Sequence, residues 1–91
     1  MSKARAHLFI KGRVQGVFFR AFTRSVAQKL GINGWVRNLY DSRVEAVFEG
    51  DRGLIEQTIT ECRKGPPGSY VQDIEVSWEE YSCMFEGFEI R

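Results

Sequence analysis

A nine-residue stretch at positions 12–20, Gly-Arg-Val-Gln-Gly-Val-Phe-Phe-Arg, carries the residues best suited to chemistry in this chain. Gly12 and Gly16 can adopt backbone conformations that other residues resist, and they allow main-chain N–H groups to approach a ligand closely. An alternating apolar run precedes the stretch and a helical pattern follows it. Its end therefore opens a helix whose first N–H groups lack partners, and such a site binds anions, phosphate above all.

Arg20 strengthens the prediction of an anion site. A cation in the first turn of a helix opposes the helix dipole and lowers stability unless an anion compensates. Lys11 and Arg13 add positive charge, and no Asp or Glu occurs from Lys11 to Arg24. Spacing alone leaves two alternatives, because Arg20 could pair with a distant carboxylate or extend into water. The stretch is neither a Walker loop nor a Gly-x-Gly-x-x-Gly dinucleotide motif.

The composition is typical of a small globular protein. The 91 residues are 43% hydrophobic, which suits one domain over residues 1–91 with its own core. Thirteen Lys and Arg oppose twelve Asp and Glu, so the basic excess of a general nucleic-acid-binding protein is missing. The sequence contains no apolar run long enough for a membrane span and no signal peptide, so we expect a cytoplasmic monomer.

The cysteines and the histidine do not suggest a metal site. Cys62 and Cys83 lack the spacing of metal ligands and the chain has one histidine, so we expect no metal and no cofactor. The two cysteines could form a disulfide, but a cytosolic setting would keep both thiols reduced. Helical periodicity predicts that Cys62 belongs to the core. His7 falls on the polar face of its strand and well before the loop, which predicts a solvent-facing side chain.

Hydrophobic periodicity predicts five strands and two helices. Phe18 and Phe19 enter the first helix, and we expect both to anchor the loop in the core. They could instead line a substrate pocket, but aromatic residues beside a helical stripe usually belong to the core. The strands are expected at about 5–12, 32–39, 43–49, 70–79 and 85–90, and the helices at 19–30 and 52–64. The first helix is expected to bury a stripe formed by Phe22, Val26 and Leu30, flanked by Ala21 and Ser25.

The order of these elements predicts an α+β fold of the ferredoxin-like (βαββαβ) type. Strands 5–12 and 32–39 are joined by a helix and should be parallel with a right-handed crossover. Strands 32–39 and 43–49 form a hairpin, and strand 43–49 fits between the two parallel strands. The result is an open-faced sandwich with a mostly antiparallel sheet of four to five strands and two helices on one face.

This topology brings Asn38 close to the glycine loop. Parallel strands end at the same sheet edge, and one intervening strand separates their ends by about 9–10 Å, twice the inter-strand spacing. Asn38 offers an acceptor and a donor that could orient a water, although Asn before a turn is also an ordinary turn residue. No Ser-His-Asp or Cys-His set is visible. An enzyme without such a set needs a substrate that reacts with little assistance. An acyl phosphate is such a substrate, because its carboxylate leaves without a general acid.

The stretch 12–20 resembles the phosphate-loop signature of the acylphosphatase family, and Gly-Trp-Val-Arg-Asn at 34–38 is similar to the family's second signature. Segments 44–50 and 87–91 are also similar, so the resemblance covers nearly the whole chain. It implies metal-independent hydrolysis of an acyl phosphate to a carboxylate and inorganic phosphate. Family members often have Asp-Gly in the hairpin turn where this chain has Asp41-Ser42, which affects the expected hairpin geometry and not the chemistry.

The resemblance also implies roles for individual residues. The backbone N–H groups of residues 15–19 would hold the phosphate, Arg20 would bind its oxygens, and Asn38 would orient the attacking water. Position 18 usually varies in the family, so Phe18 is expected to carry little functional weight. The implied catalytic residues are Arg20 and Asn38, and the implied phosphate-binding residues are Gln15, Gly16, Val17, Phe18, Phe19 and Arg20.

Two other functions fit the same topology. An RNA-binding module would stack bases on aromatic side chains of the open sheet face, where Phe9 is expected, but Glu45 and Glu49 fall on that face and no RNP1-like run is present. A catalytically idle anion-binding or regulatory domain would share the loop without needing both Arg20 and Asn38. We therefore expect a small acyl phosphate as the partner, and neither nucleic acid nor a membrane.

Overall fold

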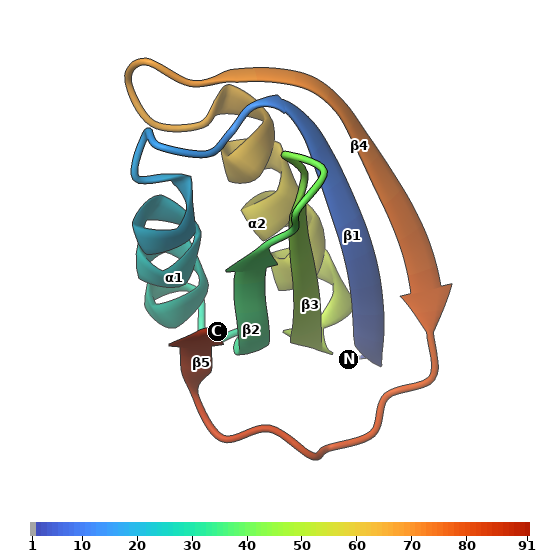
Figure 1. Ribbon diagram of the computed structural model, residues 1–91. Coiled ribbons are helices and arrows are strands. Elements are labelled where there is room, and N and C mark those ends of the chain that lie inside the picture. The colour runs from blue at the N-terminus through green and yellow to red at the C-terminus, as the bar shows by residue number, and fades with distance from the viewer. Residues whose placement is uncertain (1) are drawn as a thin grey trace.

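The computed structural model describes residues 2–91, which form a five-stranded sheet with two helices packed on one face (Figure 1). The strand order is β4-β1-β3-β2-β5, with β2 and β5 parallel and the other neighbouring strands antiparallel. The ferredoxin-like prediction, with the third strand between the first two, is confirmed. The elements are β1 (Lys3–Arg13), α1 (Phe19–Lys29), β2 (Asn33–Asn38), β3 (Val44–Asp51), α2 (Arg52–Lys64), β4 (Tyr70–Glu79) and β5 (Phe88–Ile90).

The core lies between the sheet and the helices because apolar residues alternate along each central strand. On β1 and β3, the buried residues Leu8 and Ile10 pair with Ala46 and Val44. Cys62 of α2 is buried as predicted, and Asp51 caps α2 by accepting a hydrogen bond from the Leu54 N–H at 3.2 Å. No helix within residues 2–91 is long and apolar enough to cross a membrane.

Helix α1 is rotated relative to its predicted orientation. Its fully buried residues are Phe19, Thr23 and Ala27. Phe19 inserts into the core and fixes this rotation, and Thr23 can be buried because its hydroxyl donates to the Phe19 carbonyl at 2.9 Å. The buried face of the helix is therefore displaced by about one residue from the predicted stripe. Phe22, Val26 and Leu30 are only half-buried, and Ala21 and Ser25 are exposed.

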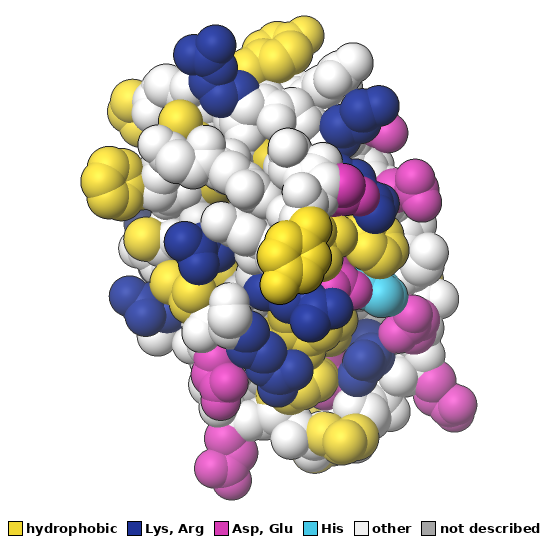
Figure 2. Space-filling model, in the orientation of Figure 1, with side chains coloured by type: hydrophobic (Ala, Val, Ile, Leu, Met, Phe, Trp, Pro, Cys, Tyr) yellow, Lys and Arg dark blue, Asp and Glu magenta, His cyan; other side chains and the backbone are white. Residues whose placement is uncertain are grey.

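His7 lies on the polar, open face of the sheet as predicted, but its side chain is only partly exposed because it contacts acidic groups. Figure 2 shows this side chain at the surface between acidic groups, and its Nε2 lies 2.6 Å from Glu45 Oε2. Its Nδ1 lies 3.4 Å from Glu79 Oε2, and Arg37 Nε donates to the other Glu45 oxygen at 2.6 Å. The open face of the sheet therefore carries a network of ion pairs, which strand periodicity alone does not reveal.

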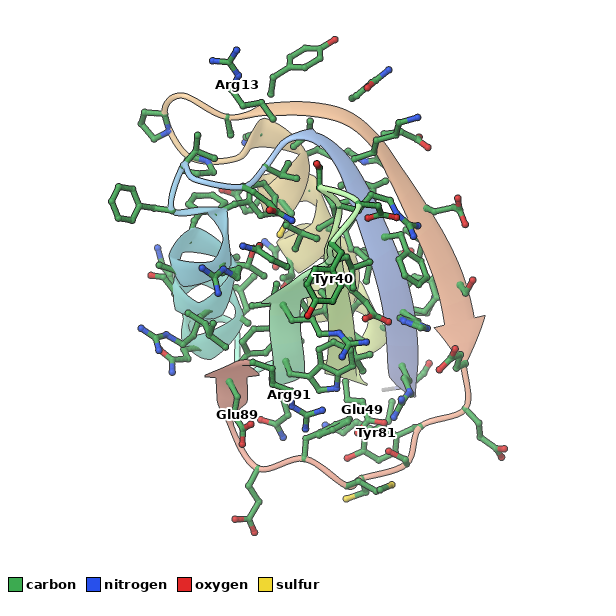
Figure 3. The ribbon with its side chains drawn as sticks, in the orientation of Figure 1. Arg13, Tyr40, Glu49, Tyr81, Glu89 and Arg91 are labelled. Carbon is green, nitrogen blue, oxygen red and sulfur yellow. The ribbon has the colours of Figure 1, made fainter. Side chains whose placement is uncertain are left out.

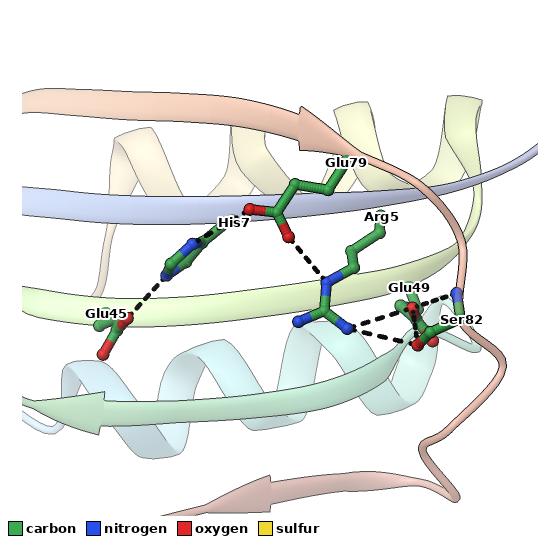
Figure 4. Close-up of polar contacts among 6 residues, drawn as sticks. All are labelled: Arg5, His7, Glu45, Glu49, Glu79 and Ser82. Atoms are coloured by element: carbon green, nitrogen blue, oxygen red, sulfur yellow. Dashed lines mark hydrogen bonds and ion pairs between the residues drawn. The ribbon is translucent and has the colours of Figure 1, made fainter.

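The last strand is shorter than predicted, because residues 80–87 form a link across one end of the open face. Figure 3 shows Glu49 and Tyr81 together where the link passes the sheet. Ser82 holds the link there, since its N–H and its hydroxyl both donate to Glu49 Oε2, at 2.8 and 2.6 Å (Figure 4). Arg5 Nη1 lies 3.5 Å from the same oxygen. The link delivers β5 to the side of β2 that faces away from β3.

Candidate active site

The loop between β1 and α1 is anchored at both ends and turns sharply between them. Val14 and Phe19 are each 1% exposed, so both belong to the core. Between them, Gly16 and Phe18 adopt left-handed conformations with φ of 75° and 62°. Alternation of left-handed and ordinary residues turns successive main-chain N–H groups toward one concave side, and such a concavity binds anions. Phe18 itself is 83% exposed, so the expectation that it anchors the loop was wrong.

A pocket of about 340 Å³ lies at the start of α1. The register of the sheet brings Asn38 to it, because Val44 of β3 pairs with Ile10 of β1 on one side and with Asn38 on the other. The predicted catalytic residues Arg20 and Asn38 therefore line the same pocket. The full lining is Val14, Gly16, Phe18, Phe19, Arg20, Ala21, Asn38 and Ile90.

Arg20 has no carboxylate partner in the part of the chain that the structure describes. Within residues 2–91 no ion pair involves it, and the first turn of α1 contains no acidic residue. Pairing with a distant carboxylate, one of the alternatives left open by the sequence, is therefore excluded. The guanidinium and the positive end of the helix dipole lie together at the pocket, and an anion bound there would compensate both.

Asn38 has an unusual side-chain environment. Its Oδ1 atom is buried and has no hydrogen-bond partner among the described residues. Buried polar atoms are nearly always paired, so an unpaired acceptor in a pocket calls for an explanation. A carboxamide with free hydrogen-bonding capacity at this position is suited to hold a water molecule or a substrate oxygen.

Gln15 acts through its side chain in a way that the sequence analysis missed. Its Nε2 donates to the main-chain oxygens of Leu39 and Arg43, at 2.8 and 3.0 Å. The Leu39 N–H also donates to the Arg43 carbonyl at 2.8 Å, which closes the β2–β3 hairpin. Gln15 thus ties the loop to the hairpin that follows Asn38. The sequence signal was a long polar side chain between Val14 and Val17, in a loop facing a turn.

The predicted phosphate-binding residues divide into two groups. The side chains of Gln15 and Val17 are absent from the pocket lining, since Gln15 reaches the hairpin and Val17 packs against the core. Gly16, Phe18, Phe19 and Arg20 line the pocket. Both cysteines are free and lie outside it, and no group of three or more His, Cys, Asp or Glu among residues 2–91 is placed to hold a metal ion.

The acylphosphatase family model matches residues 6–90. The chain belongs to the acylphosphatase family. An acylphosphatase from Pelotomaculum thermopropionicum is 49% identical over 99% of this chain and 98% of its own length, and one from Pyrobaculum arsenaticum is 55% identical over 99% and 96%.

Solved acylphosphatases share the fold closely. The crystal structure of acylphosphatase from Bacillus subtilis superposes with a TM-score of 0.94 at 34% identity, covering 97% of this chain and 98% of that chain. A full-length HypF in a phosphate- and nucleotide-bound form contains a similar region, with a TM-score of 0.86 at 31% identity, and this chain covers 12% of it. The acylphosphatase fold therefore occurs both alone and within a larger protein.

The hairpin turn contains Asp41-Ser42, where the family resemblance leads us to expect Asp-Gly. Ser42 adopts φ 78°, a left-handed conformation that glycine reaches without steric cost. Asp41 stabilises the turn, because its carboxylate accepts hydrogen bonds from the Arg43 N–H at 3.2 Å and from Arg43 Nε at 2.8 Å. The hairpin keeps a tight turn even though a side chain occupies the glycine position.

Proposed function

We propose that this chain hydrolyses acyl phosphates by direct attack of a water molecule that Asn38 orients, on a phosphate held by the loop amides and Arg20. Membership of the acylphosphatase family makes the chain an acyl-phosphate hydrolase. The proposal concerns which residues perform the reaction and how. The observation that carries it is the convergence of Arg20 and Asn38 on one pocket. Among residues 2–91, Arg20 lacks a carboxylate partner and the Asn38 Oδ1 lacks a hydrogen-bond donor.

The proposed reaction needs no covalent enzyme intermediate. The water oxygen bonds to phosphorus while the bond from phosphorus to the acyl oxygen breaks, and the acyl oxygen leaves with the bonding electrons as a carboxylate. A phosphate oxygen takes the proton that the water loses, and the second product is inorganic phosphate. The loop N–H groups, the helix dipole and Arg20 stabilise the charge on the transferring oxygens, so we propose that no metal takes part.

Hydrolysis of benzoyl phosphate in excess chelator tests the proposal. We expect full activity in chelator, competitive inhibition by inorganic phosphate, and a melting temperature that rises with millimolar phosphate because a ligand that binds the native state stabilises it. Activity lost in chelator and restored by Mg²⁺ or Zn²⁺ would overturn the metal-independent mechanism. Absence of hydrolysis with a normal phosphate-dependent rise in melting temperature would indicate an idle anion-binding domain.

We also propose that the chain works as a single-domain cytoplasmic monomer, without nucleic acid or membrane as a partner. The edge strand β4 carries Asp73, Glu75 and Glu79, and charged edge strands resist pairing with a second chain. The near balance of 13 Lys and Arg against 12 Asp and Glu supports the absence of an RNA partner, because it gives little net attraction for a nucleic-acid backbone. Size-exclusion chromatography with light scattering and a titration with single-stranded RNA test these points.

A further inference from the structure

The pocket contains more apolar surface than a phosphate requires. Only Arg20 and Asn38 contribute polar side chains to its lining. The other side chains around it are apolar, and Phe18, Ala21 and Ile90 come from three different elements: the loop, the first turn of α1 and β5. We call Phe18, Ala21 and Ile90 the apolar wall of the pocket. An inorganic phosphate would bind to the polar groups and would make no use of this wall.

Phe18 is the conspicuous member of the apolar wall. It lines the pocket, it is 83% exposed, and its φ of 62° is a left-handed conformation that is unfavourable for a bulky residue. Exposure and backbone strain both oppose a phenylalanine here, and strained residues of this kind cluster where a ligand is bound. Its neighbour Phe19 is in contrast buried in the core.

The direction of the reaction points the acyl group toward this wall. In phosphoryl transfer the attacking and leaving oxygens lie roughly in line on opposite sides of phosphorus. Asn38, which would hold the water, belongs to the sheet. A leaving carboxylate on the far side of phosphorus from the sheet would extend toward the loop and the first turn of α1, where Phe18 and Ala21 lie.

We propose that Phe18 is a specificity-determining residue and that, with Ala21, it forms a subsite for the acyl group. The enzyme then favours acyl phosphates with an aromatic or branched apolar acyl group over those with a small or charged one. This inference rests on the proposed function, and it assigns to Phe18 a role that the family resemblance did not predict.

Two substrates that differ only in the acyl group test the inference. We expect kcat/KM to be higher for benzoyl phosphate than for acetyl phosphate, and Phe18→Ala to lower the benzoyl-to-acetyl ratio of kcat/KM by about tenfold, since loss of apolar contact acts on the larger substrate. Phe18→Leu should retain most of the preference. Tyr40→Ala is the matched control, because Tyr40 is an exposed aromatic residue that does not line the pocket and lies over the open face in Figure 3.

Binding of compounds that cannot be hydrolysed gives a readout independent of turnover. Benzylphosphonate should inhibit more strongly than methylphosphonate. Phe18→Ala should reduce this difference in inhibition, and should weaken inhibition by benzylphosphonate much more than inhibition by inorganic phosphate. Equal losses with both substrates and weaker phosphate inhibition would mean that Phe18 only shapes the loop, and would overturn the inference while the proposed function stands. A parent chain that hydrolyses neither substrate would instead overturn the proposed function, and the inference with it.

Discussion

The side-chain nitrogen of Gln15 lies 2.8 Å from the main-chain oxygen of Leu39, the residue that follows Asn38. This hydrogen bond and the one to Arg43 at 3.0 Å join the phosphate loop to the hairpin at the end of β2. The loop and Asn38 come from strands that do not neighbour each other in the sheet. Gln15 therefore links the two parts of the site directly, and we expect it to set the distance between phosphate and water.

Replacing Gln15 with alanine tests this positioning role. Loss of two hydrogen bonds should destabilise the fold by about 1–2 kcal/mol. We expect kcat for benzoyl phosphate to fall at least about tenfold, because small misplacements of reacting groups are costly. Gln28→Ala, on an exposed position of α1, is the control. A folded Gln15→Ala chain with unchanged kcat would show that the loop and the hairpin hold their positions without this link.

Replacing Arg20 and replacing Asn38 should impair the enzyme in different ways. Arg20 would contact phosphate in the ground state and the transition state, so Arg20→Ala should weaken both phosphate binding and the rate. Asn38 would contact chiefly the water, so Asn38→Ala should lower kcat by about a hundredfold or more, roughly 2.7 kcal/mol, and leave phosphate affinity nearly intact.

Calorimetric titration with phosphate separates the two roles, and circular dichroism establishes that each variant is folded. Near-normal kcat in a folded Asn38→Ala chain would reduce Asn38 to a turn residue. Unchanged phosphate affinity in folded Arg20→Ala would show that the loop amides bind phosphate without the guanidinium.

Ser42→Gly should stabilise the protein. A non-glycine residue in the left-handed region is unfavourable by about 1–2 kcal/mol, and the greater freedom of glycine in the unfolded chain offsets part of the gain. We expect a net increase of about 0.5 kcal/mol in the free energy of unfolding, measured by urea denaturation. Ser25→Gly, the same change on an exposed helical position, should act in the opposite direction. Destabilisation by Ser42→Gly would mean that the serine side chain itself supports the turn.

The two thiols should differ sharply in reactivity. Burial raises the pKa of Cys62 to about 12, so this thiol stays protonated at neutral pH, whereas Cys83 is exposed. A thiol reagent should modify one cysteine in the native protein and two after denaturation. The Cys62→Ser, Cys83→Ser double variant should be less stable but active, because neither thiol lines the pocket. An inactive but folded double variant would contradict the site assignment.

The acidic residues of the open face should make stability depend on pH. Burial raises the pKa of Glu45, but hydrogen bonds from His7 and Arg37 outweigh it and hold the pKa below its ordinary value of 4.5. Burial likewise raises the pKa of Glu49. The hydrogen bonds from Ser82 and the charge of Arg5 outweigh burial, so the pKa of Glu49 is also lowered. The stabilisation is therefore complete above pH 4.5 and is lost as the pH falls through the lowered values.

Melting temperatures measured between pH 7 and pH 3 check this dependence. The parent chain should lose stability below pH 4.5 more steeply than Glu45→Gln, which lacks the titrating group. Glu86→Gln changes an exposed carboxylate that forms no ion pair among the described residues, and should follow the parent. Identical acid profiles for the parent and Glu45→Gln would contradict a role for this carboxylate.

Sequence patterns predicted the elements that bury one face and end at strong signals. Helix α2, from Arg52 to Lys64, matches its predicted range because Asp51 caps its start and Gly65 follows its end. The strand order followed from connection rules, and it placed Asn38 near the loop. The rotation of α1 could not be predicted, because Phe22 and Phe19 offer competing apolar faces and the geometry of the loop decides between them.

Contacts between side chains on different strands could not be predicted from the sequence, for a different reason. The contacts of His7 with Glu45 and Glu79 depend on strand register, and the hydrogen bonds of Gln15 depend on the shape of two loops. The exposure of Phe18 likewise depends on a left-handed backbone conformation that aromatic residues rarely adopt. Local periodicity contains none of this information.

The pocket draws its walls from segments far apart in the chain: the loop at 14–21, Asn38, and Ile90 of β5. Strand β5 reaches its place only through the long link and parallel pairing with β2, a non-local step of the kind that slows folding. We expect a refolding chain to form the loop and the β2–β3 hairpin before Ile90 completes the pocket. Phosphate binding would then recover at an earlier stage of folding than full discrimination between substrates, which needs the complete pocket.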